Sequence, residues 1–279
     1  MGARRSLLFV PGARPDRFDK AVAAGADMVC VDLEDAVPPH LKDEAREVAL
    51  KWLCEKHSEP ERVIRINSLK SISGLRDLVR AAELAPELGF IFLPKVDSPE
   101  ELRIADKILT EAGSQARLMA LIESVDGLEH VQEIATATPR LELLLFGAVD
   151  LSAELGCSLD HEVLLYARSR TVHAARRAGI GALDVPSLAV KDNEVVSAEA
   201  RAARALGFSG KAALHPINIE AIHSAFSPTA REIEQAEKVL SAYEASSTGL
   251  TVIDGKLVDK PVVLKMQQII AAANALCSS

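Results

Sequence analysis

The sequence predicts an α/β protein: a (β/α)8 TIM barrel followed by a C-terminal extension of helices and a hairpin. Three observations support this fold class, namely the length of 279 residues, a series of short apolar runs, and helical patterns between those runs. A barrel of this kind takes roughly 250 residues. The length also fits two average domains, so the order of the predicted strands and helices has to distinguish a single barrel from two domains.

Eight short apolar runs, each bounded by turn-forming residues, predict eight buried strands. A parallel strand that is covered on both faces reads as a nearly continuous apolar run, without the alternation of a half-exposed strand. The runs are SLLFVP (6–11), MVCVDLE (28–34), RVIRIN (62–67), FIFLPKV (90–96), RLMALIES (117–124), LELLLFGA (141–148), IGALDVPS (180–187) and GKAALHP (210–216).

The segments between the runs have helical periodicity. Between Leu41 and Leu53, apolar residues recur on one face of a helix. The segment SPEE at 98–101 has the form of a capping box with proline in the first turn, and predicts a helix that ends at Gly113. Strand and helix therefore alternate, which favours a closed barrel. A doubly wound sheet is disfavoured because no G-x-G-x-x-G follows the first run.

The residues after the eighth run predict an extension. A helix runs to about Tyr243, Asp254-Gly255 marks a hairpin turn within TVIDGKLVD, and Pro261 begins a final helix. We therefore expect a barrel domain over residues 1–225 and an extension over residues 226–279. Since the barrel can close without it, we expect the extension to pack on a neighbouring subunit.

The composition excludes several classes of protein. A hydrophobic content of 48%, a charged content of 26% and a net charge of -8 indicate a globular protein and argue against a nucleic-acid partner. No run approaches 18 apolar residues, so no membrane span is predicted. The four cysteines show no C-x-x-C spacing, which predicts reduced thiols in a cytoplasmic protein.

The candidate site lies where the predicted strands end, because barrels place their active sites at the carboxyl ends of the strands. Carboxylates that converge there repel one another unless a cation lies between them, and oxygen ligands favour magnesium or manganese. Glu123 and Asp150 follow adjacent strands and are the first candidates for metal ligands. Alternatively, each caps the helix that follows it. The polar residues at the strand ends are Asp32, Glu34, Asp35, Arg65, Asn67, Lys95, Glu123, Asp150, Asp184 and His215.

Two sets of cations have open roles. Arg65 in VIRIN can pair with the carboxylates of DLED, or its planar fork can bind a substrate carboxylate or an enolate. A cationic patch that suits a phosphate-bearing ligand is formed by Arg14, Arg17 and Lys20. Alternatively, these three residues belong to a solvated helix face.

The motifs RRSLLFVPG, DLEDAV, KDEAR, RIN, LPKV, LIES, FGAVDL and a late HP follow one another in this order. Together they resemble the citrate lyase beta-subunit-like group of the HpcH/HpaI aldolase family, which includes malyl-CoA and citramalyl-CoA lyases. The resemblance runs from residue 4 to about residue 270. It implies a TIM barrel that forms homotrimers or hexamers, and a Mg²⁺ ion held by Glu123 of LIES and Asp150 of GAVDL.

The resemblance also assigns roles to further residues. It implies that Arg65 and Glu123 contact the substrate, and that Glu34 and Asp35 orient Arg65 and the waters on the metal. Asp259 of GKLVDKP corresponds to an aspartate that reaches a neighbouring subunit's active site. The residues that correspond to the coenzyme A contacts of relatives are Phe9, Arg14, Arg17, Lys20, His215 and Pro216. Pro15 and Asp16 stand where some relatives carry lysines.

The implied activity is a magnesium-dependent carbon–carbon lyase. Such an enzyme splits a 3-hydroxy-3-carboxyacyl-CoA, for example malyl-CoA or citramalyl-CoA, into an acyl-CoA thioester and a 2-oxo acid, or runs the reverse condensation. Arg65 would stabilise the thioester enolate and Asp259 would protonate it. The alternatives are a class II aldolase acting on free hydroxy-oxo acids, a citrate lyase beta subunit acting on a carrier-protein thioester, and a non-catalytic barrel that binds coenzyme A or oxo acids.

Overall fold

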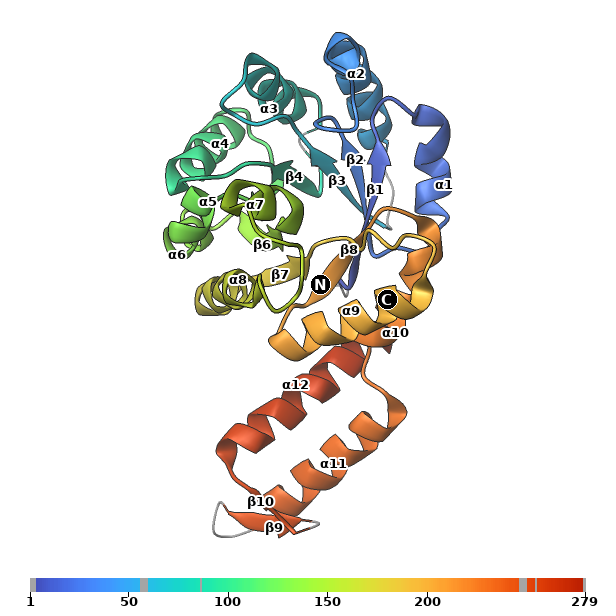
Figure 1. The fold of residues 1–279 in the computed structure, drawn as a ribbon, viewed down its shortest axis with the longest axis vertical. Helices are drawn as coiled ribbons and strands as arrows, with labels where there is room; N and C mark the ends of the chain where they lie inside the picture. The colour runs from blue at the N-terminus through green and yellow to red at the C-terminus, as the bar shows by residue number, and fades with distance from the viewer. Residues whose placement is uncertain (1–3, 56–59, 86, 246–249, 254, 278–279) are drawn as a thin grey trace. The chain divides into compact units, whose positions relative to one another are not determined.

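The computed structural model describes the chain except for residues 1–3, 56–59, 86, 246–249, 254 and 278–279. Eight parallel strands form a closed barrel in the order of the sequence (Figure 1). The fold class predicted from the sequence is confirmed. The strands are β1 (Ser6–Pro11), β2 (Met28–Asp32), β3 (Glu61–Arg65), β4 (Phe90–Leu93), β5 (Arg117–Ile122), β6 (Leu141–Phe146), β7 (Gly181–Asp184) and β8 (Gly210–Ala213).

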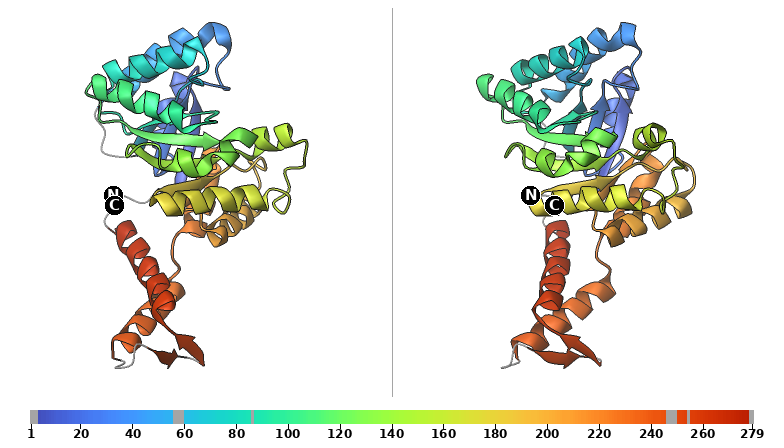
Figure 2. Two further views of the ribbon diagram at one scale, coloured as in Figure 1. Left: turned by 90° about the vertical axis from the view of Figure 1, so that its left-hand side faces the viewer. Right: turned by 60° about the vertical axis from the view of Figure 1, so that its left-hand side comes forward.

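Helices surround these strands, and all views of this part of the chain show them outside the barrel (Figures 1 and 2). Each strand is followed by at least one of them. They are α1 (Phe18–Val22), α2 (Lys42–Leu53), α3 (Ile72–Leu84), α4 (Pro99–Glu111), α5 (Val125–Glu129), α6 (Val131–Ala135), α7 (Ala148–Leu155), α8 (Leu165–Ala178), α9 (Asn193–Leu206) and α10 (Ile219–Phe226). Short 3-10 turns occupy Pro15–Arg17, Pro39–Leu41 and Pro216–Asn218.

Several strands end earlier than their apolar runs predict. The run at 28–34 yields a strand that stops at Asp32, and the run at 90–96 yields one that stops at Leu93. Each run extends to an apolar residue beyond its strand because the chain stays buried after it leaves the sheet, as shown by Leu33 and Val96, which have no exposed surface. An apolar run therefore marks burial beyond the strand as well as the strand.

The predicted helix after the fourth strand begins at the right residue, but its capping box is wrong. Ser98 is the N-cap of α4, and its hydroxyl makes no capping hydrogen bond. Glu101 turns to the preceding bend, where it accepts the Asp97 N–H at 3.1 Å and lies 3.8 Å from the Lys70 ammonium. Glu101 also faces the Ser98 N–H, so the half of the box that is missing is the bond from the Ser98 hydroxyl.

The interior of the barrel is a packed core, as expected for eight strands. Alternate side chains of the strands point inward and form one buried cluster, against which the half-buried Phe9 packs. Leu121 and Leu145 belong to this cluster at its carboxyl end, close to the cavity described below. The buried members are Leu7, Met28, Cys30, Val63, Phe90, Phe92, Met119, Leu121, Leu143, Leu145, Leu183 and Ala212.

By its contacts the chain divides into two compact units, Arg4–Ala225 and the residues from Phe226 onward. The second unit has its own small core, made by Val239, Ile253, Val258 and Val263. Asp254 of the predicted hairpin turn lies outside the described residues. The elements of this unit are α11 (Ala230–Glu244), the antiparallel strands β9 (Thr251–Ile253) and β10 (Lys256–Val258), and α12 (Lys260–Cys277). Within the described residues, no helix has the length and apolar character to span a membrane.

Candidate active site

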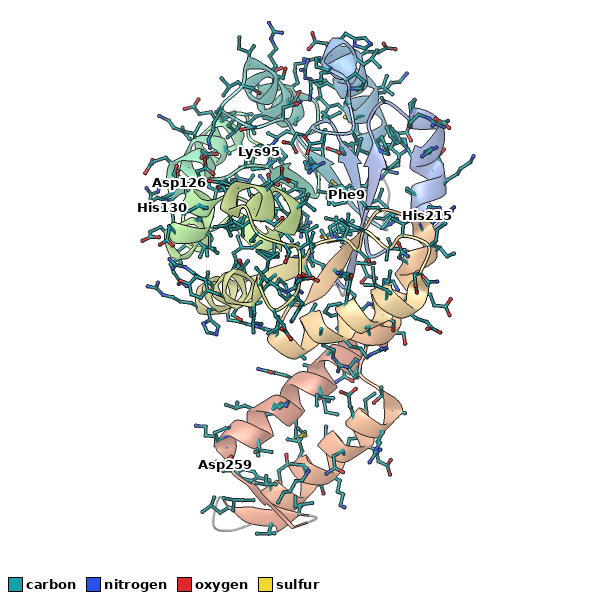
Figure 3. The ribbon with its side chains drawn as sticks, viewed as in Figure 1. Phe9, Lys95, Asp126, His130, His215 and Asp259 are labelled. Atoms are coloured by element: carbon teal, nitrogen blue, oxygen red, sulfur yellow. The ribbon has the colours of Figure 1, made fainter. Side chains whose placement is uncertain are left out.

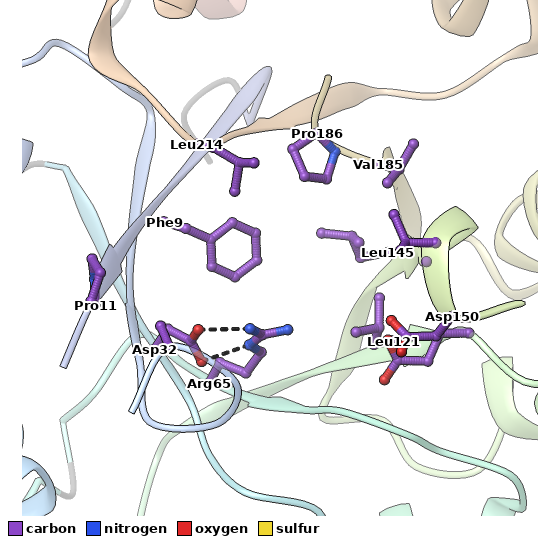
Figure 4. A pocket seen from close by; sticks show the side chains of 14 residues that line it. Phe9, Pro11, Asp32, Arg65, Leu121, Leu145, Asp150, Val185, Pro186 and Leu214 are labelled. Atoms are coloured by element: carbon purple, nitrogen blue, oxygen red, sulfur yellow. Dashed lines mark hydrogen bonds and ion pairs between the residues drawn. The ribbon is translucent and has the colours of Figure 1, made fainter. Parts of the chain in front are cut away.

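A cavity of about 230 Å³ lies at the carboxyl ends of the barrel strands (Figure 4). Every barrel strand except β4 contributes to its lining through its last residues or the loop that follows. Most of the lining is apolar, and the charged side chains are Asp32, Arg65, Glu123 and Asp150. The remaining lining residues are Phe9, Pro11, Ala36, Leu121, Leu145, Gly147, Val149, Val185, Pro186 and Leu214.

Arg65 is fixed within this lining by a carboxylate of the neighbouring strand. Its Nε and Nη2 each donate to Asp32 at 2.7 Å, as the dashed lines in Figure 4 show. Asp32 and Arg65 are register partners at the ends of β2 and β3, so their side chains project from the same face. Nη1 lies 3.2 Å from Glu34 Oε2, and the guanidinium stacks over the Phe9 ring at 5.0 Å.

These contacts settle one of the alternatives left by the sequence. Arg65 does pair with the DLED carboxylates, and it also lines the cavity. Burial alone would lower the pKa of Arg65, but the hydrogen bonds with Asp32 and the charges of Asp32 and Glu34 raise it. Arg65 is therefore a permanent and preorganised cation beside the cavity.

Glu123 follows β5 and has only 5% of its surface exposed. The helix cap next to it is Ser124, whose hydroxyl accepts the Gly127 N–H at 3.0 Å, so the reading of Glu123 as a cap is wrong. Its Oε1 accepts the Lys95 N–H at 2.8 Å. Burial, followed by the nearby charges of Glu34 and Asp150, raises the pKa of Glu123 to about 8.

Asp150 lies in the first turn of α7. The sequence left open that it caps a helix beginning at Leu151, but α7 begins at Ala148 with Gly147 as its N-cap. Asp150, labelled in Figure 4, therefore makes no cap, and it lines the same cavity as Glu123. The two carboxylates come from adjacent strands, since β5 pairs with β6.

The raised pKa of Glu123 predicts a stability change with pH. The folded state holds the Glu123 proton more tightly than the unfolded state, so its contribution to stability falls as the pH rises from about 5 to about 8. Glu123→Gln removes the ionisation. With a chelator present, we expect this variant to melt at least about 3 °C above the parent at pH 9, and within about 1 °C of it at pH 5. Thermal unfolding followed by circular dichroism measures both differences.

Glu44→Gln is the matched control for that experiment, because Glu44 is an exposed carboxylate on α2. Its melting temperature relative to the parent should not change with pH. If the Glu123→Gln variant is no more stable than the parent at pH 9, then ionisation of the buried carboxylate does not destabilise the folded state.

Two residues at the site have contacts that the sequence revealed only in part. Asp32 was one of the DLED carboxylates expected as partners of Arg65, and it makes both short hydrogen bonds to that residue. Lys95 was recognised only as a polar residue at a strand end. Its Nζ lies 2.8 Å from Glu34 Oε1 and 3.7 Å from Asp35 Oδ1. The signal for both was their place at the ends of neighbouring strands, which brings opposite charges together.

Other predicted residues lie outside the cavity lining. Arg14 is paired with Asp16 through two hydrogen bonds of 2.8 Å, and His215 Nδ1 accepts the Ile217 N–H at 3.2 Å. Asp259, labelled in Figure 3, belongs to the second unit. Its carboxylate accepts the Val262 N–H at 3.4 Å at the start of α12. The remaining candidates for coenzyme A contacts that do not line the cavity are Arg17, Lys20 and Pro216.

A closed (β/α)8 barrel whose strand ends surround a charged cavity defines a class of proteins with one site at the barrel mouth. Within that class, residues 5–216 match the sequence model of the HpcH/HpaI aldolase/citrate lyase family. The chain belongs to this family.

Its relatives match over nearly their whole length. The chain is 34% identical to the citrate lyase subunit beta of Leuconostoc mesenteroides subsp. cremoris, over 98% of this chain and 94% of that protein. It is 32% identical to the (3S)-malyl-CoA thioesterase of Cereibacter sphaeroides, over 98% and 96%. Among solved structures, CitE from Mycobacterium tuberculosis in complex with magnesium, acetoacetate and coenzyme A superposes with a TM-score of 0.84, at 32% identity and 98% coverage of both chains.

Proposed function

We propose that this protein is a magnesium-dependent carbon–carbon lyase that acts on a 3-hydroxy-3-carboxyacyl-CoA such as malyl-CoA or citramalyl-CoA. Its products are an acyl-CoA and a 2-oxo acid, and the reverse condensation uses the same site. One observation carries the proposal: a single cavity presents the carboxylates Glu123 and Asp150 together with the buried cation Arg65, which is paired with a third carboxylate, Asp32. The CitE relative that binds magnesium, acetoacetate and coenzyme A supports it.

The residues of the cavity fit a magnesium ion. Glu123 and Asp150 both line it, and burial, followed by the charges of Glu34 and Asp150, raises the pKa of Glu123, so a bound cation would stabilise both charges. Across the described residues, no three His, Cys, Asp or Glu side chains are grouped to hold a metal together. Mg²⁺ is often held by only one or two carboxylates together with waters and substrate. When bound, the ion acts as a Lewis acid toward the hydroxyl and carboxylate that become the 2-oxo acid.

The protein's own side chains stabilise the charge that develops on the other product. When the bond between the carbinol carbon and the thioester α-carbon breaks, the electron pair moves to the thioester as an enolate. Arg65 lies at the cavity with its fork already held by Asp32, so it can stabilise the enolate oxygen without reorganising. The apolar side chains of Leu121 and Leu145 keep water away from the carbanion carbon.

The proton donor in this proposal is Asp259 from a neighbouring subunit, within a homotrimer or hexamer in the cytoplasm. Asp259 donates one proton to the α-carbon, the hydroxyl proton of the substrate passes to water, and water returns a proton to Asp259 for the next turnover. Arg14, Arg17 and Lys20 would bind the phosphates of coenzyme A on one side of the site, with His215 and Pro216 on the other. Arg14 would exchange Asp16 for a phosphate.

Purified protein with magnesium and a panel of malyl-CoA, methylmalyl-CoA and citramalyl-CoA tests the proposal. We expect release of a 2-oxo acid, measured as its phenylhydrazone, together with the matching acyl-CoA. Free coenzyme A without an oxo acid would instead indicate a thioesterase. Turnover only of free 4-hydroxy-2-oxo acids would indicate an aldolase, and turnover only of a carrier-protein thioester would indicate a citrate lyase beta subunit. Each of these three results would overturn the proposal that the protein is a lyase of coenzyme A thioesters.

The absence of a side chain at Gly147 leaves the space that the Glu123 side chain needs, and this gives a testable prediction. Ile122 pairs with Phe146, so the next residues, Glu123 and Gly147, lie side by side. A Cβ on Gly147 would lie 2.4 Å from Glu123 Cβ, which is closer than atoms can approach. We therefore expect Gly147→Ala to move Glu123 and to weaken Mn²⁺ binding, measured by paramagnetic resonance, by at least about 10-fold.

Gly156→Ala is the matched control for Gly147→Ala. Gly156 has φ of 65°, and a Cβ there would meet nothing within 4 Å, so this variant loses stability through backbone strain alone. Its Mn²⁺ affinity should equal that of the parent. Equal affinity in Gly147→Ala as well would mean that Glu123 is not a ligand or can move freely.

A further inference from the structure

Lys95 has a backbone conformation found at no other non-glycine residue in the described part of the chain. Its φ is 53°, in the left-handed region, where a residue with a side chain is strained compared with an ordinary conformation. Glycine takes this conformation without that strain. Such strain persists where the surrounding structure imposes it, and it is concentrated at functional sites. The presence of lysine where glycine would avoid the strain therefore indicates a role for the lysine side chain.

The turn around Lys95 is held from both sides. Lys70 Nζ donates to the Lys95 carbonyl at 3.2 Å. On the other side, the Val96 carbonyl is so close to Gly127 of α5 that a Cβ there would lie 2.5 Å from it. The Ser124 hydroxyl also donates to Asp97. These contacts fix the bend between β4 and α4, and with it the left-handed conformation of Lys95.

This conformation lets one residue serve two carboxylates of the site. The backbone N–H donates to Glu123 Oε1 at 2.8 Å, and the ammonium lies 2.8 Å from Glu34 Oε1. Glu34 is 6% exposed and needs cations to stay charged, because burial raises its pKa while Arg65 and Lys95 lower it. Hydrogen bonding to Glu34 in turn raises the pKa of Lys95.

A chain of alternating charges then leads from Lys95 into the cavity. Glu34 bridges two cations, with Oε1 toward Lys95 and Oε2 at 3.2 Å from Arg65 Nη1. The other edge of Arg65 is held by Asp32. Lys95 does not itself line the cavity, as β4 contributes nothing to its wall. Its backbone N–H reaches the cavity through Glu123, whereas its ammonium can influence the reaction only through Glu34 and Arg65.

We propose that Lys95 is a positioning residue whose ammonium fixes Glu34 and, through Glu34, the direction in which Arg65 faces the reacting thioester. The part that concerns the thioester rests on the lyase function proposed above. Without the ammonium, Glu34 loses one of its two cations and the ion pair between Arg65 Nη1 and Glu34 loses a fixed anion. Since Arg65 acts on charge that develops in the transition state, the loss falls on kcat, and substrate binding changes little.

The first test measures stability and needs no activity. In metal-free protein, Lys95→Met should lower the melting temperature by at least about 3 °C, because it leaves Glu34 with one cation fewer. In a Glu34→Gln background the same substitution should change it by less than about 1 °C. Equal shifts in both backgrounds would show that the two side chains do not interact, and would overturn the proposal.

The second test measures kinetics on the thioester that the parent cleaves. Lys95→Met and Lys95→Gly should each lower kcat at least about 10-fold while KM changes less than about 3-fold, and Lys95→Arg should recover most of kcat. Lys95→Gly keeps the N–H to Glu123 and removes the strain, so it separates the role of the ammonium from that of the backbone. Lys107→Met, at an exposed lysine of α4, is the control and should match the parent.

The outcomes separate the two proposals. A parent protein that cleaves no thioester refutes the lyase function, and the stability comparison still decides whether Lys95 fixes Glu34. An active parent together with full kcat in Lys95→Met and Lys95→Gly overturns the role of Lys95 and leaves the lyase function standing.

Discussion

Asp150→Asn and Glu123→Gln are each expected to reduce magnesium-dependent turnover by far more than 100-fold. Changing a residue that only supports a metal ligand costs about 10–100-fold, and these two substitutions remove the anionic oxygen itself. Both keep the shape of the side chain, so the fold should be intact. The measurement is kcat/KM at saturating magnesium, with circular dichroism to verify the fold.

The matched control for these variants is Glu154→Gln. Glu154 lies on α7 like Asp150, but its carboxylate accepts the Val125 N–H at 3.1 Å and does not line the cavity. We expect it to retain turnover within a few-fold of the parent. If Asp150→Asn or Glu123→Gln also retained turnover, that residue would not be a metal ligand.

The second large effect concerns Asp259. Asp259→Ala alone and Glu123→Ala alone should both be inactive, and oligomers that contain both chains should regain activity. If Asp259 serves a neighbouring subunit's site, some sites then receive an intact Glu123 from one chain and an intact Asp259 from another. When equal amounts of the two chains assemble at random, about one quarter of all active sites contain both intact residues. The measurement is turnover after subunit exchange, which mass spectrometry verifies.

A second mixture provides the control. Glu123→Ala and Asp150→Ala change two residues of the same cavity, so mixing these two chains should restore nothing. Recovery in the Asp259 mixture alone identifies a shared site. No recovery despite confirmed exchange, or full activity of Asp259→Ala by itself, would leave the extension with a role in assembly only.

Much of the barrel could be predicted because buried parallel strands leave a clear signal in the sequence. The eight apolar runs correspond to the eight strands in order. The ends of the strands were less well predicted, since Leu33 and Val96 are buried outside the sheet. The capping box at Ser98 is incomplete because the Ser98 hydroxyl makes no capping hydrogen bond, while Glu101 accepts the N–H of the neighbouring Asp97 and lies near Lys70, which the tertiary fold brings close.

The site shows the same division between what strand order reveals and what it does not. Arg65, Glu123 and Asp150 line one cavity because each follows a barrel strand, and strand order alone brings them together. The hydrogen bonds of Asp32 depend on its register with Arg65, which no single run of residues reports. The left-handed conformation of Lys95 is imposed by neighbours from other parts of the chain.

The apolar floor of the cavity has a consequence for how substrate range can change. Leu121 and Leu145 belong both to the cavity wall and to the packed interior of the barrel. Under the lyase function proposed above, replacing either by alanine would make room for a bulkier acyl chain or oxo acid, and it would also remove about 2–5 kcal/mol of folding free energy. A lineage that widens its substrate range through these positions therefore needs a reserve of stability beforehand, or a compensating substitution elsewhere in the barrel. For directed evolution, the starting point should be a thermostabilised parent.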